Sequence, residues 1–470
     1  MITKYKFSVT VGFIVIGLHL MCGSALLFSQ SVRTDYFLNN SETRSSMNPA
    51  FHPNQGFMGF PFLSEVGVGV YTNFLNLDHL TFKRNGERVT FLHPSVSSAD
   101  FLSELPDQSY VDLNFNYKAL AFGWKDKKNG YWTIDLGMRA LANIIIPRSA
   151  FELMKNGFSE NENETKAYSI QNIQAAVTAF AEVGAGYSKG FLDNDLNVGA
   201  KVKLLFGIAN MDMRIDHLNV STGNGEWIAQ SKATLDGVLL GIKPEYDKKN
   251  QFNGIDNHGM GISGLGAGLD IGGAYTFLDK RAHVSLAFTD IGFISWTKNN
   301  SMHLATPETE VRINSEQKDF NNDNNFDDRL STIYDDLKET INFKETGQKV
   351  AKTTLRTGMN AGIAYEVWKQ NLSLGALFSS YMGRGHTTNE LTFSANYNPF
   401  KVRWFSAALS YSVIHNRFNT VGFAMHLTPR KGIHLFLGSD FLVPHVNKDF
   451  IPTSSKASNF QVGISFPIVD

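Results

Sequence analysis

The chain has 470 residues, with 43 Lys and Arg against 44 Asp and Glu, so it has no basic excess that would suit nucleic acid. It contains 37 Phe and 40 Gly, yet beyond residue 30 no apolar run approaches the roughly 18 residues that a membrane-spanning helix needs. These features exclude a helical membrane protein. They leave a soluble all-β protein, or a membrane barrel whose apolar residues are spread out by alternation.

Residues 1–30 are typical of a cleaved signal peptide. Lys4 and Lys6 form a basic start, an apolar stretch follows from Phe7, and small residues at 23–25 or 29–30 offer cleavage sites. The only cysteine, Cys22, lies in this segment, so the mature chain is expected to lack thiols, which suits an oxidising periplasm. We predict export to the outer membrane of a Gram-negative bacterium.

A two-residue period runs through the rest of the chain. Between Leu196 and Ile208 the even-numbered residues are apolar, while Lys201 and Lys203 lie on the other face. The same alternation covers 132–139, 265–272, 420–427 and 459–466. The second face carries mostly small uncharged residues with isolated charges, which is typical of a narrow barrel lumen rather than a face in bulk water. Aromatic residues near predicted strand ends are expected at the membrane interface: Tyr117, Trp132, Tyr187, Trp296, Trp368 and Trp404.

The alternation predicts an all-β fold, a transmembrane antiparallel β-barrel of about 14 strands. Fifteen segments alternate, and short links between them alternate in turn with the long links 76–109, 147–172, 297–353 and 443–456. This order of links fails only around 226–241. Treating 226–241 as an extracellular excursion gives fourteen spanning strands, whereas an unrecognised strand in 242–263 would give 16.

Some of the long links have helical spacing. Residues 95–105 and 327–341 combine that spacing with acidic first turns, and 147–156 could form a third short helix. We expect these short loop helices to cap the mouth of the barrel.

The stretch Met47-Asn48-Pro49-Ala50-Phe51 resembles the N-terminal Asn-Pro-Ala motif of the long-chain fatty acid transporter (FadL) family and of PorV-type barrels. Strand-like stretches at 186–203 and 287–296 resemble the same superfamily. More narrowly, 90–96 together with 290–296 is similar to an uncharacterised outer-membrane barrel family, a domain of unknown function that spans nearly the whole chain.

The resemblance implies an N-terminal plug or hatch at 31–60, folded into the lumen of a barrel formed by 61–470. Asn48, Pro49 and Ala50 would then lie in the pore. Pro49 fixes φ and lacks a donor, so it suits a turn or helix start better than a strand ladder. An ordinary turn at the head of the chain is the alternative interpretation of these three residues.

One acidic loop has the spacing of calcium ligands, with oxygen-bearing side chains at Asp319, Asn321, Asp323, Asn325 and Asp327. The pattern is incomplete, because its sixth position is Asn324 instead of Gly and its twelfth is Leu330 instead of Glu. A solvated acidic loop is the preferred interpretation, and weak surface calcium is the alternative. The scattered histidines have no metal-site spacing, so neither a metal nor another cofactor is predicted.

No Gly-x-Ser-x-Gly element or other catalytic constellation is present in the sequence, so we do not expect an enzyme. The first hypothesis is a passive FadL-like transporter of hydrophobic or amphipathic small molecules, with outer-membrane lipid around it and a hydrophobic ligand in its lumen. The alternative is a PorV-like secretion-associated or structural barrel that binds partner proteins through its extracellular loops at 76–109, 147–172, 218–263 and 297–353.

Overall fold

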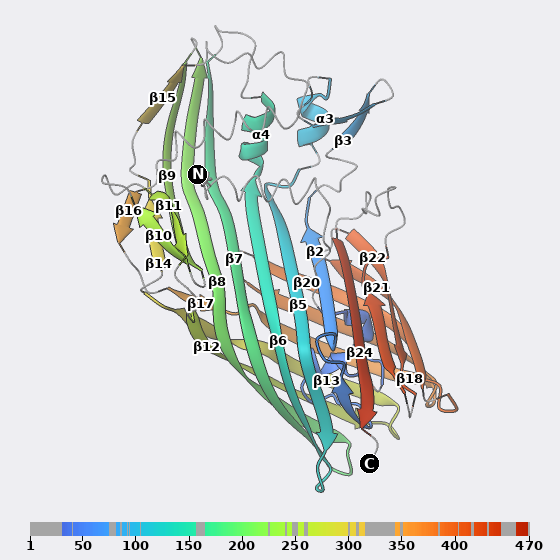
Figure 1. Ribbon diagram of the computed structural model, residues 1–470. Coiled ribbons are helices and arrows are strands. Elements are labelled where there is room, and N and C mark those ends of the chain that lie inside the picture. The colour runs from blue at the N-terminus through green and yellow to red at the C-terminus, as the bar shows by residue number, and fades with distance from the viewer. Residues whose placement is uncertain are drawn as a thin grey trace.

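Fourteen antiparallel strands close into a barrel in the computed structural model (Figure 1), as the alternation predicted. The structure describes most of residues 31–468; the longest segments outside it are 1–30, 75–80, 157–164, 247–251, 315–343 and 443–456, with shorter gaps elsewhere. In chain order the wall consists of β2 (Glu65–Thr72), β5 (Gln108–Lys125), β6 (Gly130–Pro147), β7 (Lys166–Phe191), β8 (Leu196–Gly223), β12 (Gly264–Phe277), β13 (Ala282–Trp296), β18 (Thr357–Trp368), β19 (Leu372–Met382), β20 (Thr387–Tyr397), β21 (Phe405–Ile414), β22 (Phe418–Leu427), β23 (His434–Ser439) and β24 (Ala457–Ile468).

The two faces of the wall follow the period of the sequence. On β8, Val202 and Leu204 are 60% and 61% exposed on the outer face, whereas the intervening Lys203 is 5% exposed inside. Strand β20 alternates exposed and buried residues over its whole length. Because side chains on successive strand residues point to opposite faces, alternation in sequence becomes an apolar outer surface and a polar inner one.

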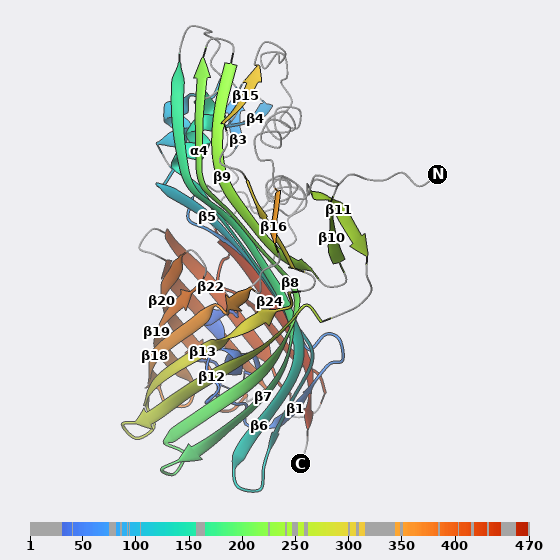
Figure 2. The same ribbon diagram turned by 90° about the vertical axis from the view of Figure 1, so that its left-hand side faces the viewer.

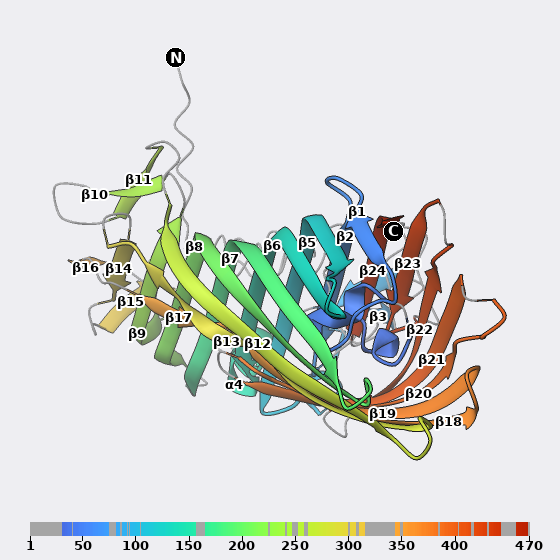
Figure 3. The same ribbon diagram turned by 90° about the horizontal axis from the view of Figure 1, so that it is seen from below.

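The wall closes where β24 meets the start of the chain. β24 pairs with both β1 (Gly56–Gly59) and β2, and each of these also pairs with β5 (Figure 3). β1 and β2 therefore occupy one position in the wall, one after the other. This pairing corrects the predicted bounds of the interior segment, 31–60. The chain enters the wall at Gly56, so only residues up to 55 lie inside the barrel.

The described part of segment 226–241, residues 226–239, lies outside the membrane-spanning wall, as the order of links predicted. β9 (Glu226–Leu239) pairs with residues 209–223 of β8, whereas residues 196–207 of β8 pair with β12. The hairpin of β10 (Ile242–Tyr246) and β11 (Phe252–Asn257) pairs only with itself. The alternative of 16 wall strands is therefore not realised.

Strands β7 and β8 extend far beyond the rest of the wall at one end (Figure 2). They contain 26 and 28 residues, whereas about 9–11 tilted residues cross the hydrocarbon layer. Their extension continues into β9, which pairs with β14 (Ser301–Ala305) and β15 (Glu310–Asn314). Two further short strands, β16 (Lys344–Gly347) and β17 (Lys352–Thr354), pair with β14 and β13.

Short helices lie at the same end, above the barrel mouth (Figure 1). α3 (Ser98–Leu102) and α4 (Arg148–Asn156) confirm two of the three predicted loop helices, and 327–341 lies outside the described residues. Phe101 of α3 and Phe151 of α4 pack against each other and against Phe91, next to the hairpin of β3 (Thr81–Arg84) and β4 (Glu87–Thr90). No helix among the described residues is long and apolar enough to cross a membrane.

The expected aromatic girdle is partly correct. Trp132, Trp368 and Trp404 are exposed beside short turns, where an interfacial ring would contact lipid headgroups. Trp296 was predicted with them, and that prediction is wrong: it is 2% exposed, and its indole donates to Thr353. The sequence gives no sign of this, because the space for the ring is left by glycines of two other strands.

Candidate functional site

Residues 31–55 lie inside the barrel, against its inner wall (Figure 3). The segment contains two short 3-10 helices, η1 (Arg33–Asp35) and η2 (Thr43–Ser46). Val32, Thr34 and Tyr36 have no exposed surface, although helices this short have no core of their own. Their burial therefore comes from contacts with the barrel wall.

Arg33 fixes the start of the segment to the wall. Its guanidinium contacts Glu390 on β20 at 3.0 Å and Asp440 after β23 at 3.3 Å. Asp440 also accepts the backbone N–H groups of Arg33 and Thr34, at 3.0 and 2.9 Å. Burial alone would lower the pKa of Arg33, but the two carboxylates outweigh it and raise that pKa above its usual value. Arg33 therefore stays charged and paired.

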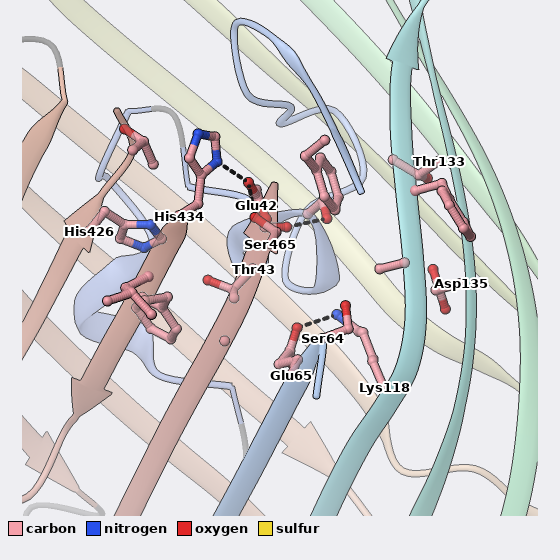
Figure 4. Close-up of a pocket in the computed structure, with 18 of the residues that line it drawn as sticks. Glu42, Thr43, Ser64, Glu65, Lys118, Thr133, Asp135, His426, His434 and Ser465 are labelled. Carbon is pink, nitrogen blue, oxygen red and sulfur yellow. Dashed lines mark hydrogen bonds and ion pairs between the residues drawn. The ribbon is translucent and has the colours of Figure 1, made fainter. Parts of the chain in front are cut away.

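Two histidines of the wall bind carboxylates of the segment. His426 Nε2 lies 2.8 Å from Asp35 Oδ1, and His434 Nδ1 lies 2.8 Å from Glu42 Oε1 (Figure 4). Ser465 on β24 donates a further bond to Glu42 at 2.7 Å. The segment is thus fastened to β20–β24 by charged and polar side chains.

The Asn-Pro-Ala motif lies on the opposite side of the segment, against β8 and β12. Asn48 is fully buried; its amide donates to the Gly273 carbonyl at 3.3 Å, and its Oδ1 accepts the N–H of Ala50 at 3.0 Å. A Cβ on Gly199 would lie 2.1 Å from the Pro49 carbonyl oxygen, and one on Gly272 would lie 2.2 Å from Asn48 Oδ1.

Gly199 and Gly272 are direct cross-strand partners. We call this pair of glycines, one from each strand, the seat of the motif. The motif can approach the wall this closely because neither residue has a side chain.

A cavity separates the segment from the β5–β6 side of the wall (Figure 4). Glu42 and Thr43 line it from the segment, and Glu65, Lys118 and Asp135 line it from the wall. These charged groups alternate with apolar side chains, among them Phe57 and Phe122. The segment therefore fills only part of the barrel cross-section at this level.

The wall beside this cavity is incompletely laddered. Of the described residues, only Thr72 of β2 pairs with β5, at Val111, although residues 65–71 pair continuously with β24. Between β1 and β2 the chain turns outward at Phe60–Leu63, and Phe62, at φ 62°, is 74% exposed. We call the β2–β5 junction from Glu65 to Thr72 the seam.

Side chains hold the seam where backbone pairs do not. Glu65 accepts from Lys118 at 2.6 Å and from Asn116 at 2.8 Å, both on β5, and from Gln461 of β24 at 2.8 Å. Figure 4 shows the Glu65–Lys118 pair at the edge of the cavity. In lipid every backbone group must find an internal partner, so a junction held by side chains is the weakest part of such a wall.

The residues predicted as calcium ligands, Asp319 to Asp327, lie outside the described residues. In the part of the chain that the structure describes, no group of three or more His, Cys, Asp or Glu side chains is arranged to hold a metal ion.

An apolar, lipid-facing exterior around a buried, charged interior defines a transmembrane β-barrel of the outer-membrane type. Residues 49–440 match the family of unknown function DUF5723, so the chain belongs to that family. This confirms the resemblance to an uncharacterised barrel family. No protein of curated function matches the sequence.

Several solved structures are similar at low identity. The toluene transporter TodX of Pseudomonas putida is 10% identical, with 95% of this chain and 100% of that chain covered and a TM-score of 0.39. A deletion mutant of the monoaromatic hydrocarbon channel TodX is 9% identical, with 91% and 95% covered and a TM-score of 0.40. A FadL homologue of Pseudomonas aeruginosa is 10% identical, with 94% and 99% covered and a TM-score of 0.27. At this level of likeness no substrate carries over to the chain.

Proposed function

We propose that the protein is a passive outer-membrane transporter of hydrophobic or amphipathic small molecules, and that residues 31–55, with Asn48, Pro49 and Ala50 seated on β8 and β12, act as its plug. The observation that carries the proposal is the seam, which lies between an internal cavity and the membrane-facing side of the wall and is held by side chains except at the Thr72–Val111 pair. Cargo of low polarity would leave the cavity sideways into lipid. On this route its apolar surface would not be exposed to water.

The signal peptide and the extracellular position of the extended end belong to the same proposal. An exported barrel with short turns facing the periplasm places the β7–β9 extension and its loops outside the cell.

The transport proposal is tested in intact bacteria with and without the protein. Entry of N-phenylnaphthylamine, an apolar dye that fluoresces in phospholipid, should rise with expression. Hydrolysis of a polar β-lactam by a periplasmic enzyme should stay constant. Equal dye entry in the two strains would contradict the transport function.

The lateral route is tested by opening the seam. Lys118→Met leaves the Glu65 carboxylate without its cation, and removing one partner of a buried ion pair typically costs about 3–5 kcal/mol. We expect dye entry to rise by at least about tenfold, the change that about 1.4 kcal/mol produces. The matched control is Lys201→Met, which breaks an equally short buried pair, 2.6 Å from Asp135. Asp135 lines the same cavity, but its pair with Lys201 joins β6 to β8 and does not cross the seam. Equal effects of the two substitutions would argue against a lateral exit.

A second candidate function rests on the extension of β7, β8 and β9. This sheet has its own apolar core, including Ile170, Met213 and Leu235, and it stands clear of the wall (Figure 2). A protein that only passes small molecules has no need of such a structure, so a scaffold that binds partner proteins is the alternative. Cross-linking in native membranes that captures a defined partner, together with unchanged dye entry, would favour it.

A further inference from the structure

Charged side chains inside the barrel join strands that are not neighbours in the wall. Arg139 on β6 makes two bonds of 2.7 Å to the carboxylate of Asp290 on β13. Strands β7, β8 and β12 lie between them in the sheet. Neighbouring strands are about 4.8 Å apart, so this pair cannot follow the wall and must cross the lumen.

The position of Asp290 is fixed from several directions. Its φ is 57°, its N–H donates to Asp270 at 2.7 Å, and Lys203 contacts both carboxylates at 2.7 Å. Glu182 on β7 lies 3.4 Å from Arg139. Each charge of the crossing pair therefore has further charged or hydrogen-bonding partners that hold it in place.

A second crossing pair lies nearer the extended end. Asp112 on β5 contacts His386, next to β20, at 2.9 Å, and Arg356, next to β18, at 3.3 Å. Five strands, β6, β7, β8, β12 and β13, separate β5 from β18 in the sheet. In a barrel of fourteen strands, these are almost opposite walls.

A small, mainly apolar cavity lies against the second crossing contact and extends to residues beside Arg139. Asp112, Arg356 and His386 line one end of it. Leu141, on β6 beside Arg139, and Phe180, the cross-strand partner of Arg139, also line it. The charged side chains of both pairs are between 4% and 20% exposed. In an open aqueous pore, inward-facing charges such as these would be hydrated.

We propose that the Arg139–Asp290 and Asp112–Arg356/His386 bridges form a seal that closes the barrel axis to ions and polar solutes without help from the N-terminal segment. Neither bridge includes a residue of 31–55. The seal leaves the cavity beside the seam untouched, so the axis can stay closed to polar solutes during lateral passage. The inference holds whatever the cargo, and even if the protein transports none.

The test is ion current through the purified full-length protein in planar lipid bilayers. Arg33→Met with Gly272→Ala removes both an anchor and the seat of the segment, and trypsin cleavage after Arg44 reports its release. The released chain is expected to pass no more current than the native one. Adding Arg139→Met and Asp112→Asn should raise the time-averaged current by at least about tenfold, the change that about 1.4 kcal/mol produces.

Two results would overturn the seal. One is a large current through the released chain with both bridges intact. The other is a closed lumen in the released chain after both bridges have been removed. A difference in gel mobility between heated and unheated samples identifies the folded barrels, and currents are compared only among these.

Two further variants serve as checks. Asp290→Asn weakens the bridge but keeps the shape of the side chain, and asparagine tolerates the positive φ. It replaces Arg139→Met if that variant does not fold, and it should give a smaller rise in the current of the released chain. Arg214→Met removes an exposed Arg whose 3.0 Å bond is to Asp212 on its own strand, and it should leave the current of the released chain unchanged. A rise with Arg214→Met equal to that with the bridge variants would also count against the seal.

Discussion

Replacing Gly272 with alanine should loosen the N-terminal segment from the wall. The added Cβ would lie 2.2 Å from Asn48 Oδ1 and 3.0 Å from Pro49 Cδ, so the motif has to move. On the adjacent residue, Gly273, an added Cβ meets nothing closer than 3.7 Å. The two substitutions have the same cost in strand propensity, and they differ only in the contact with the segment.

The magnitude follows from overpacking. Extra methyl groups in a packed interior typically cost about 1–3 kcal/mol, and Asn48 also loses hydrogen bonds worth about 0.5–1.5 kcal/mol each. A shift of about 2 kcal/mol in the docking of the segment changes its open population by roughly 30-fold.

Hydrogen exchange measures this shift directly. Amides of residues 31–50 in Gly272→Ala should exchange roughly 30-fold faster than in the native protein, because exchange follows the open population. Gly273→Ala should stay within about threefold of native. Equal exchange rates in the two variants would refute the idea that the glycine pair seats the motif.

Three other outcomes are expected. Asp440→Ala leaves Arg33 with Glu390 as its remaining carboxylate partner among the contacts described, and it should expose the segment to trypsin cleavage, whereas an uncut chain would show that other contacts suffice. Leu204→Arg places a charge on the lipid-facing surface and should lower the free energy of unfolding by about 2–4 kcal/mol. The control Gln230→Arg, on the extension, should change it little, and urea-dependent gel mobility measures both. The backbone N–H groups of Gly130 and Lys128 lower the pKa of Asp126 in the turn between β5 and β6. At pH values above the unfolded-state pKa of Asp126 its carboxylate therefore stabilises the turn, and this effect is lost as the pH falls. An NMR titration midpoint at or above about 3.9 would contradict this.

The barrel itself could be predicted from local pattern. Alternation at 196–208 assigns Val202 and Leu204 to lipid and Lys201 and Lys203 to the interior, because the strand period of two is a property of the backbone. The alternation of short and long links identified 226–241 as an excursion for a similar reason, since both ends of every antiparallel hairpin return to the same side. These features depend on neighbours along the chain.

The site was less accessible from sequence. The Asn-Pro-Ala motif drew attention to Asn48, but its seat is formed by glycines that lie far away in the chain and resemble many others. Charges on the inner face such as Lys118 and Arg139 have buried carboxylate partners, yet no local rule in the sequence could choose Glu65 or Asp290 for them. The failed prediction for Trp296 has the same origin, because the space it fills belongs to other strands.

The sequence by itself therefore determined the class of fold and the two faces of each strand, which repeat at short range, and it limited the number of strands to 14 or 16. Only the tertiary structure decided where the interior segment ends, where the wall lacks a ladder and which charges meet across the lumen. Those features depend on how the sheet curves and closes, which brings together residues separated by hundreds of positions in the chain.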